Sequence, residues 1–515
     1  MPIDNDPALS ARERTGRLYP WLVILAVVVL LSIAAGVGLI LLMPTAADKA
    51  ARFVAEGAAL EAEGKDLPAA AAYNAALAED KENTAARRAL VPNLIRRGLL
   101  ERAAMQLQAL LERSPNDPDL NLQLAELAIS RFDGQAALPH LALAQGADPA
   151  RIHAAASATR YFTSPDGPAR TTALADCEAI LEKTPTSLPA AIVVVSAAVH
   201  DNGPDYALSV ADDALGSNPH SVSLLLLRFD LLNGTAGKEA AAGDAVRALY
   251  ARFPDNREVQ RRVRDWMIAH GSPDEAVAVL RDLTARTGDR PDDHAALAAY
   301  VVAHYPDRAS VPVLDGLAAG LADQGLADGY RVRAAEVRFD QGEIERAITI
   351  LRKIVKAAPP DAGRSLPLGA LARTLAATGQ RTEALQAAEE AAALDPKNVE
   401  AQLVRAGLAL DRGDGARAVD VARQALAATP DDPGLLVALA RGYEAQDMAP
   451  LALRAMAQAV EVTKNGPAES RALIELLVKS GNRAMAETVL QAALRANPGN
   501  ADLLALAAPG GLAPP

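Results

Sequence analysis

Apolar residues recur along this chain in an order that returns every 34 residues, from about residue 50 to residue 500. Each 34-residue repeat holds two stretches with one apolar face apiece, the spacing of amphipathic helices. A glycine at position 15 separates the stretches in eight repeats, and a proline at position 32 follows the second in nine. Because glycine suits tight turns and proline ends helices, each repeat predicts a helix, a turn, a second helix and a stop. The twelve repeats begin at residues 50, 84, 118, 154, 188, 223, 257, 328, 365, 399, 433 and 467.

Position 20 of the repeat is alanine in every one of these twelve copies. A small residue is needed where one helix crosses its neighbour closely, so we predict that these alanines pack between helices. They are Ala69, Ala103, Ala137, Ala173, Ala207, Ala242, Ala276, Ala347, Ala384, Ala418, Ala452 and Ala486. Repeats of this kind make a binding surface and not a catalytic pocket.

The repeat resembles the tetratricopeptide repeat family over about residues 50–500. The resemblance implies an all-α fold, a right-handed α-solenoid of about 12–13 helix-turn-helix repeats. The family's aromatic residue near position 4 and its Leu-Gly pair at positions 7 and 8 are mostly absent. Residues 291–327 fit badly, since Tyr305-Pro306-Asp307 and Pro312 interrupt them, and we interpret them as a degenerate repeat. In the short C-terminal segment, 501–515, a capping helix over 501–507 would precede a frayed end, and the last repeat would dock a partner or a second copy.

Charge and composition narrow the range of partners. The net charge of −12 and the pI near 5.2 argue against nucleic-acid binding, which usually needs a concentrated basic face. Aromatic residues make up only 3% of the chain, so few remain to stack on sugar rings. A single cysteine, Cys177, excludes an intramolecular disulfide and a thiolate-rich metal site, and its repeat position predicts a core residue.

Residues 21–43 carry no charge and end at Pro44. As a helix they would be about 34 Å long, enough for a bilayer core of about 30 Å. We predict a transmembrane signal anchor. The alternative is a cleaved signal peptide, because Thr45-Ala46-Ala47 resembles a cleavage site, although the apolar stretch is longer than usual.

Three arginines precede the apolar stretch and two basic residues follow it, which favours a cytoplasmic tail over 1–20. The Ala-rich, Arg-rich and Lys-poor composition suggests a bacterium. In a Gram-negative cell the anchor would lie in the inner membrane and the solenoid in the periplasm. Two small-xxx-small spacings, Ser32 with Gly36 and Ala34 with Gly38, make a homo-oligomer conceivable, although small residues are frequent in any membrane helix.

Catalytic motifs are missing from the sequence. None of the seven histidines forms an i,i+4 pair or an HExxH motif, and no cysteine lies near one for zinc. The chain has no phosphate-binding P-loop and no G-x-S-x-G elbow, and the repeats occupy nearly all residues after the apolar stretch. The sequence therefore predicts a non-enzyme with no catalytic residues, no cofactor and no metal.

In tetratricopeptide proteins the first helix of each repeat lines the concave groove, chiefly through positions 2, 5, 9, 12 and 13. The resemblance implies groove roles for Arg261, Asp265, Arg373, Arg441, Glu444, Arg471, Glu475 and Lys479. Arginines along such a groove could hold the carboxylates of an extended peptide, while charge kept for solubility is the alternative. A basic helix, Arg252 to Arg264 with Trp266, leaves an anionic-polymer interpretation open, but interleaved acidic residues favour a solvated face.

The function we predict is a membrane-anchored scaffold that binds protein partners. The layout of an anchor and a long array resembles bacterial factors for exopolysaccharide or cellulose export, for cytochrome c maturation and for envelope regulation. Of these, long arrays favour polysaccharide secretion. A structural protein whose groove binds glycan or peptidoglycan is a further alternative, which the shortage of aromatic residues disfavours.

Overall fold

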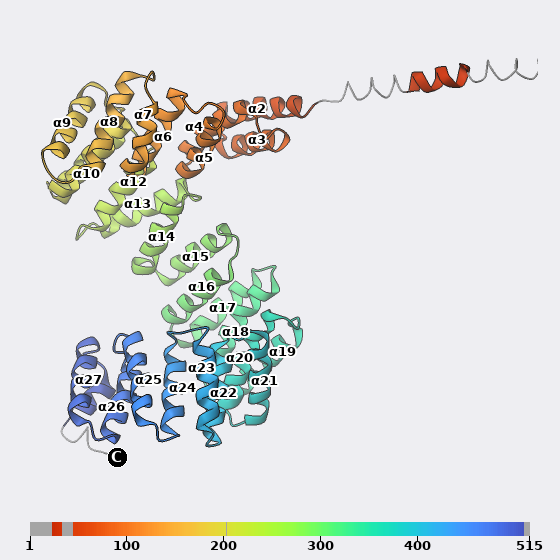
Figure 1. Ribbon diagram of the computed structural model, residues 1–515, viewed down its shortest axis with the longest axis vertical. Helices are drawn as coiled ribbons and strands as arrows, with labels where there is room; N and C mark the ends of the chain where they lie inside the picture. Colours follow the sequence, from red (N-terminus) through yellow and green to blue (C-terminus); the bar gives the residue numbers. More distant parts are fainter. Residues whose placement is uncertain (1–22, 33–44, 202, 509–515) are drawn as a thin grey trace, which may run out of the picture. The chain divides into compact units, whose positions relative to one another are not determined.

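A computed structural model describes residues 23–32, 45–201 and 203–508, and every regular element among them is helical. The chain divides into two units, Met1–Ala269 and His270–Pro515, each described here by itself. Antiparallel helix pairs follow one another along each unit (Figure 1). The structure therefore confirms the predicted all-α class and the α-solenoid.

The helices of the N-terminal unit keep the order that the repeat predicts. They are α2 (Ala46–Ala62), α3 (Asp66–Glu79), α4 (Thr84–Arg96), α5 (Leu100–Leu111), α6 (Pro118–Ser130), α7 (Gly134–Leu143), α8 (Pro149–Thr163), α9 (Pro168–Lys183), α10 (Leu188–Asp201), α11 (Pro204–Ser217), α12 (Val222–Asn233), α13 (Glu239–Arg252) and α14 (Arg257–His270), which ends at the unit boundary.

The helices of the C-terminal unit include two short 3-10 turns. They are α15 (Pro273–Arg286), α16 (Pro291–His304), η2 (Asp307–Ala309), α17 (Ser310–Ala319), α18 (Gln324–Asp340), α19 (Ile344–Ala357), η3 (Ala362–Arg364), α20 (Ser365–Ala377), α21 (Arg381–Leu394), α22 (Val399–Asp411), α23 (Gly415–Leu426), α24 (Pro433–Glu444), α25 (Ala449–Val462), α26 (Pro467–Lys479), α27 (Arg483–Ala496) and α28 (Ala501–Ala507).

Position 15 is where the backbone turns from the first helix of a repeat to the second. Seven of the eight glycines have a positive φ there, and Gly271 does not. Phe132 and Asp447 occupy the same position and also have a positive φ, 61° and 57°. The turn therefore imposes this conformation even on residues with a side chain, at a cost that glycine avoids.

The position-20 alanines are all completely buried, each with 0% of its surface exposed. Around them the cores consist mainly of alanine, leucine and valine, as in the cluster of Leu368, Ala372, Leu375 and Ala388. Where a core side chain is large, a small residue beside it leaves the space that it needs. A Cβ on Gly57 would overlap the Tyr73 ring, whose hydroxyl donates a 2.8 Å hydrogen bond to Glu61.

Residues 291–327 form a helix pair, α16 and α17, so the interrupted sequence still folds as a repeat. Pro306 follows the end of α16, and Pro312 lies in the first turn of α17, where a missing N–H breaks no helical hydrogen bond. The sequence spacing misplaces three helix starts. α2 begins at Ala46 and not at 50. Two more are capped by aspartates: α8 begins at Pro149 and not at 154, and α18 begins at Gln324 and not at 328.

Side-chain caps explain these earlier starts. Asp148 accepts hydrogen bonds from the backbone N–H groups of Ala150 and Arg151, and Asp323 accepts one from Leu326. Each cap satisfies amide groups that would otherwise lack a partner at the helix start. The capping aspartate, and not the 34-residue period, therefore sets where these two helices begin.

The predicted transmembrane helix finds no support in the structure. Residues 23–32 are helical, while the rest of the 21–43 span and the 1–20 tail lie outside the described residues. No helix among the described residues is long and apolar enough to cross a membrane. Thr45, part of the alternative cleavage site, caps α2 in a capping box with Asp48.

The C-terminal end of the solenoid is covered by α28. Asn500 caps this short helix by accepting a 3.1 Å hydrogen bond from the backbone N–H of Leu503. The Leu503 side chain is completely buried against the cluster that α26 and α27 form. Residues 509–515 lie outside the described residues, and docking of a partner at this end stays a prediction.

Candidate partner-binding face

Several groove positions of the N-terminal unit are filled by its own helices. In the repeats that begin at 118, 188 and 223, five apolar side chains at these positions are buried, with exposures of 8% or less, while Val199 is 40% exposed. The five are Leu122, Ile129, Ile192, Leu224 and Leu231. A groove that binds an extended peptide needs these side chains accessible, so this part of the unit offers no open groove.

Contacts between distant repeats close the N-terminal unit. The Ser223 hydroxyl at the start of α12 donates a 2.6 Å hydrogen bond to the carbonyl oxygen of Ser130 at the end of α6. Asn256 Nδ2 donates a 2.6 Å hydrogen bond to the Gly98 carbonyl oxygen, and Arg97 Nη2 lies 2.9 Å from Asp255 Oδ2. Repeats in a regular solenoid contact only their neighbours, so this unit departs from the regular form.

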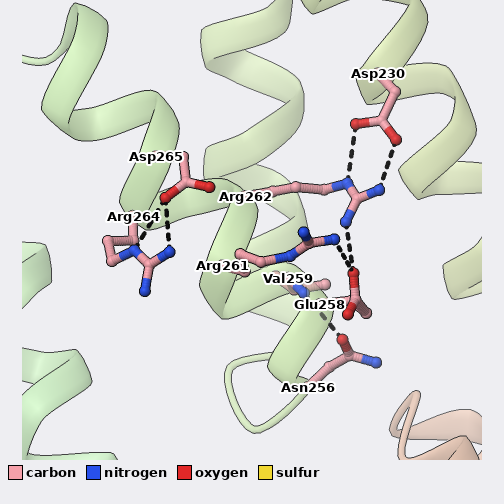
Figure 2. Close-up of polar contacts among 8 residues, drawn as sticks. All are labelled: Asp230, Asn256, Glu258, Val259, Arg261, Arg262, Arg264 and Asp265. Atoms are coloured by element: carbon pink, nitrogen blue, oxygen red, sulfur yellow. Dashed lines mark hydrogen bonds and ion pairs between the residues drawn. The ribbon is translucent and has the colours of Figure 1, made fainter.

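α14 carries Arg261 and Asp265, and the structure does not pair them with each other. Figure 2 shows Arg261 and Arg262 reaching toward Glu258, with Arg262 continuing to Asp230. Asp265 instead binds its neighbour Arg264, at 2.8 Å. Both predicted groove residues are exposed and already joined to an opposite charge.

The basic helix α14 is therefore neutralised by its own surroundings. Arg262 binds Asp230 through two hydrogen bonds of 2.9 Å and 2.7 Å, and this pairing raises the pKa of the guanidinium. Hydrogen bonds from Arg261 and Arg262 lower the pKa of Glu258. These pairings agree with the interpretation of α14 as a solvated face and leave little free positive charge for an anionic polymer.

A charge network crosses the groove of the C-terminal unit at Arg373, which lies on α20. Its Nη2 is 3.0 Å from Glu336 Oε1 on α18, and its Nε is 3.3 Å from Glu400 Oε1 on α22. Arg333 also binds Glu336, at 2.7 Å, while only 8% of the Glu336 side chain is exposed. Arg373 therefore joins three successive repeats and is not a free cation.

Within this network, the carboxyl of Glu400 has a shifted pKa. Burial and the nearby Glu336 together raise the pKa of its carboxyl to about 7, and Arg373 opposes the shift. Near neutral pH the two carboxyl groups therefore share less than two full negative charges. Protonated Glu400 can donate a hydrogen bond to Glu336, and ionised Glu400 repels it.

Replacing Glu400 by glutamine should remove a pH dependence from the stability of the C-terminal unit. A carboxyl whose pKa is raised in the folded chain stabilises it fully below the unfolded pKa of about 4.5, and this stabilisation is lost as pH rises through about 7. Because the side chain is 36% exposed, solvent screens it, and we expect a loss of ~1 kcal/mol between pH 5 and pH 8. Urea unfolding at four pH values measures it. Glu461→Gln, an exposed carboxyl of the same unit, is the matched control, and equal pH profiles for both variants would refute the assignment.

The remaining predicted groove residues lie on α24 and α26. Arg471 binds Glu475 at 2.9 Å and Asp502 of α28 at 3.4 Å, and Lys479 binds Glu444 at 2.5 Å. Arg441 is exposed, and no ion pair joins its side chain to any residue that the structure describes. Arg441 is thus the predicted groove arginine whose charge is available to a partner.

Two groove residues were missed by the sequence reasoning, Glu336 and Glu400. They occupy positions 9 and 2 of their repeats, among the same positions that identified Arg373. The repeat alignment therefore contained the signal. The predicted set included acidic residues such as Asp265 and Glu475, but it did not extend to every charged residue at these positions.

Among the described residues, no group of three or more His, Cys, Asp or Glu side chains could hold a metal ion. Cys177 is completely buried, and burial raises the pKa of its thiol to about 12, so that it is a poor nucleophile.

Comparison with known families identifies the repeat. Residues 370–433 match the family described as Tetratricopeptide repeat. The match covers helix pairs of the C-terminal unit, and together with the 34-residue period and the helix pairs on both units it supports a tetratricopeptide-repeat protein. Such repeats typically build protein-interaction scaffolds.

A curated relative is cellulose synthase operon protein C of Pseudomonas fluorescens (strain SBW25). It is 26% identical over 414 residues, which are 78% of this chain and 27% of the relative. The chain therefore spans about a quarter of the length of that relative.

Two solved structures are among those similar to this chain. MamA 41-end from Desulfovibrio magneticus RS-1 is 18% identical with a TM-score of 0.28, covering 32% of this chain and 93% of that chain. The APC/C hetero-tetramer Cut9-Hcn1 contains a chain that is 15% identical with a TM-score of 0.36, covering 88% of this chain and 95% of that chain.

Proposed function

We propose that this chain is a scaffold that binds protein partners through the groove of its C-terminal unit. The observation that carries the proposal is the contrast between the two units. Groove positions on α24 and α26 present exposed charged residues, among them Arg441 and Glu475, whereas those on α6, α10 and α12 include five buried apolar side chains. Accessible, charged positions on rigid helices suit recognition of an extended protein segment.

The process that the scaffold serves is, in this proposal, synthesis or export of an exopolysaccharide, with cellulose as the first candidate. The support is the likeness to cellulose synthase operon protein C, which covers 78% of this chain. The shortage of aromatic residues favours protein partners over direct binding of the polymer.

The proposal also places the chain in a bacterial inner membrane through residues 21–43, with residues 1–20 in the cytoplasm and the solenoid in the periplasm. Its support is the sequence alone: an uncharged apolar stretch flanked by basic residues. Alkaline-phosphatase fusions after residue 60 test this placement, because the enzyme is active only when it is exported.

Charge reversal at Arg441 tests the scaffold function. The loss of a central interface arginine commonly costs more than 1 kcal/mol of binding, so Arg441→Glu should weaken partner binding about tenfold and reduce secreted cellulose in the native host. Arg454→Glu is the matched control, an exposed arginine on α25 outside the groove positions.

The readouts separate the two parts of the proposal. Equal secretion and equal recovery of co-purified proteins in both variants, at matched protein levels, would refute the scaffold function. Loss of co-purified proteins with normal secretion would leave the scaffold standing and refute its role in polysaccharide export.

A further inference from the structure

Three arginines of the C-terminal unit meet at a small cavity that lies outside the groove positions. The cavity has a volume of about 90 Å³ between α21, α22 and α23. Arg405 reaches it from α22, Arg412 from the turn that follows, and Arg417 from α23. The scaffold function proposed above does not use these residues.

None of the three guanidinium groups has an ion-pair partner within 4.0 Å among the residues that the structure describes. Arginines on the neighbouring helices do have one: Arg373 binds Glu336, and Arg381 binds Asp411 at 3.2 Å. Burial lowers the pKa of Arg405, and the like charge of Arg417 lowers it further. The cavity therefore gathers positive charge that no nearby carboxylate neutralises directly.

Two carboxylates also line the cavity, and neither forms an ion pair with an arginine there. Asp414 accepts a 2.9 Å hydrogen bond from the backbone N–H of Arg417 and so caps α23. Glu389 is exposed on α21, and it attracts Arg405 only over a longer distance than an ion pair. With two carboxylates and three guanidinium groups, the lining of the cavity carries one net positive charge, whereas the whole chain carries a net charge of −12.

One side of the cavity is held in place, while Arg412 and Arg417 are exposed at its mouth. Arg405 is half-buried, and its Nη1 donates a 2.7 Å hydrogen bond to Gln402 Oε1, which fixes the guanidinium. Leu385, Ala409 and Val421 close the apolar side. A guanidinium held in place loses little entropy when it binds a ligand.

We propose that this arginine pocket binds a phosphate-sized oxyanion, either free or as a monoester group on a larger molecule. Guanidinium groups match the oxygens of such an anion through paired, charge-assisted hydrogen bonds. An anion among the three arginines also relieves the repulsion between Arg405 and Arg417. The volume of about 90 Å³ admits one such group.

Calorimetric titration of the full chain with inorganic phosphate, at constant ionic strength against chloride, tests the proposal. Phosphate binds at one site per chain and raises Tm, and the variants Arg405→Gln and Arg417→Gln each weaken binding at least tenfold. Arg454→Gln, an exposed arginine on α25, serves as the control and binds as the parent does. Far-UV circular dichroism checks that every variant is folded.

A second arm uses glycerol 3-phosphate. Tighter binding than inorganic phosphate assigns the site to a phosphate ester, and equal binding assigns it to the free ion. Without any added anion, Arg417→Gln raises Tm, because the repulsion of Arg405 is removed; a fall in Tm would contradict the proposal. A response to phosphate no larger than to chloride, or one that Arg405→Gln and Arg417→Gln leave unchanged, would overturn it.

Discussion

Replacing Ala384 by leucine should unfold the middle of the C-terminal unit under conditions where the parent chain is stable. Ala384 lies on α21 at position 20 of its repeat, is completely buried and belongs to the cluster of Leu371, Leu375 and Ala388. Three added carbon atoms have no space there, and overpacking of a tight core costs about 1–3 kcal/mol or more. We expect a loss of about 3 kcal/mol in the free energy of unfolding, measured by urea denaturation.

The control for this prediction lies on the same helix. Ala393 is exposed, so Ala393→Leu adds the same side chain without crowding and should change stability by less than about 0.5 kcal/mol. If the two substitutions have equal effects, position 20 does not set the helix spacing.

Replacing Phe253 by alanine should open the N-terminal unit. Phe253 is 1% exposed and lies beside Gly98, where an added Cβ would come within 3.0 Å of the ring. Removing a buried phenyl ring costs about 3–5 kcal/mol. It also weakens the contacts that join distant repeats, so unfolding should become less cooperative, with a shallower dependence on urea.

Hydrogen exchange localises this second effect. The amides of Gly98 and Leu99, at the turn that Phe253 covers, should lose protection before the core of α6 does. Phe132→Ala, which removes a phenyl ring that is 40% exposed, is the control in the same unit. Unchanged protection at Gly98 in Phe253→Ala would refute the closure of this unit.

The 34-residue period predicted those features of the fold that depend only on packing between neighbouring helices. The buried alanines and the turn at position 15 follow from local packing, and Phe132 and Asp447 keep the turn even without glycine. The starts of α8 and α18 escaped the period because single capping aspartates, Asp148 and Asp323, set them.

Contacts between distant residues could not be predicted from the period. Asn256 and Gly98 are 158 residues apart, and an alignment of repeats says nothing about whether the solenoid closes on itself. The groove positions were predictable, but the partners were not. Arg373 binds Glu336 and Glu400 because their side chains meet across three helices, and no pattern within one repeat encodes that meeting.

In-cell photo-crosslinking tests the central claim most directly. A photoreactive residue in place of Ala468, an exposed groove position on α26, probes the groove and keeps Arg441, and one in place of the exposed Arg454 probes the surface outside the groove positions. The scaffold account predicts that, in the native host, position 468 captures a defined set of proteins that position 454 does not, and that mass spectrometry identifies them. Equal capture at both positions, or no capture at 468 with the chain folded and expressed, would contradict the account.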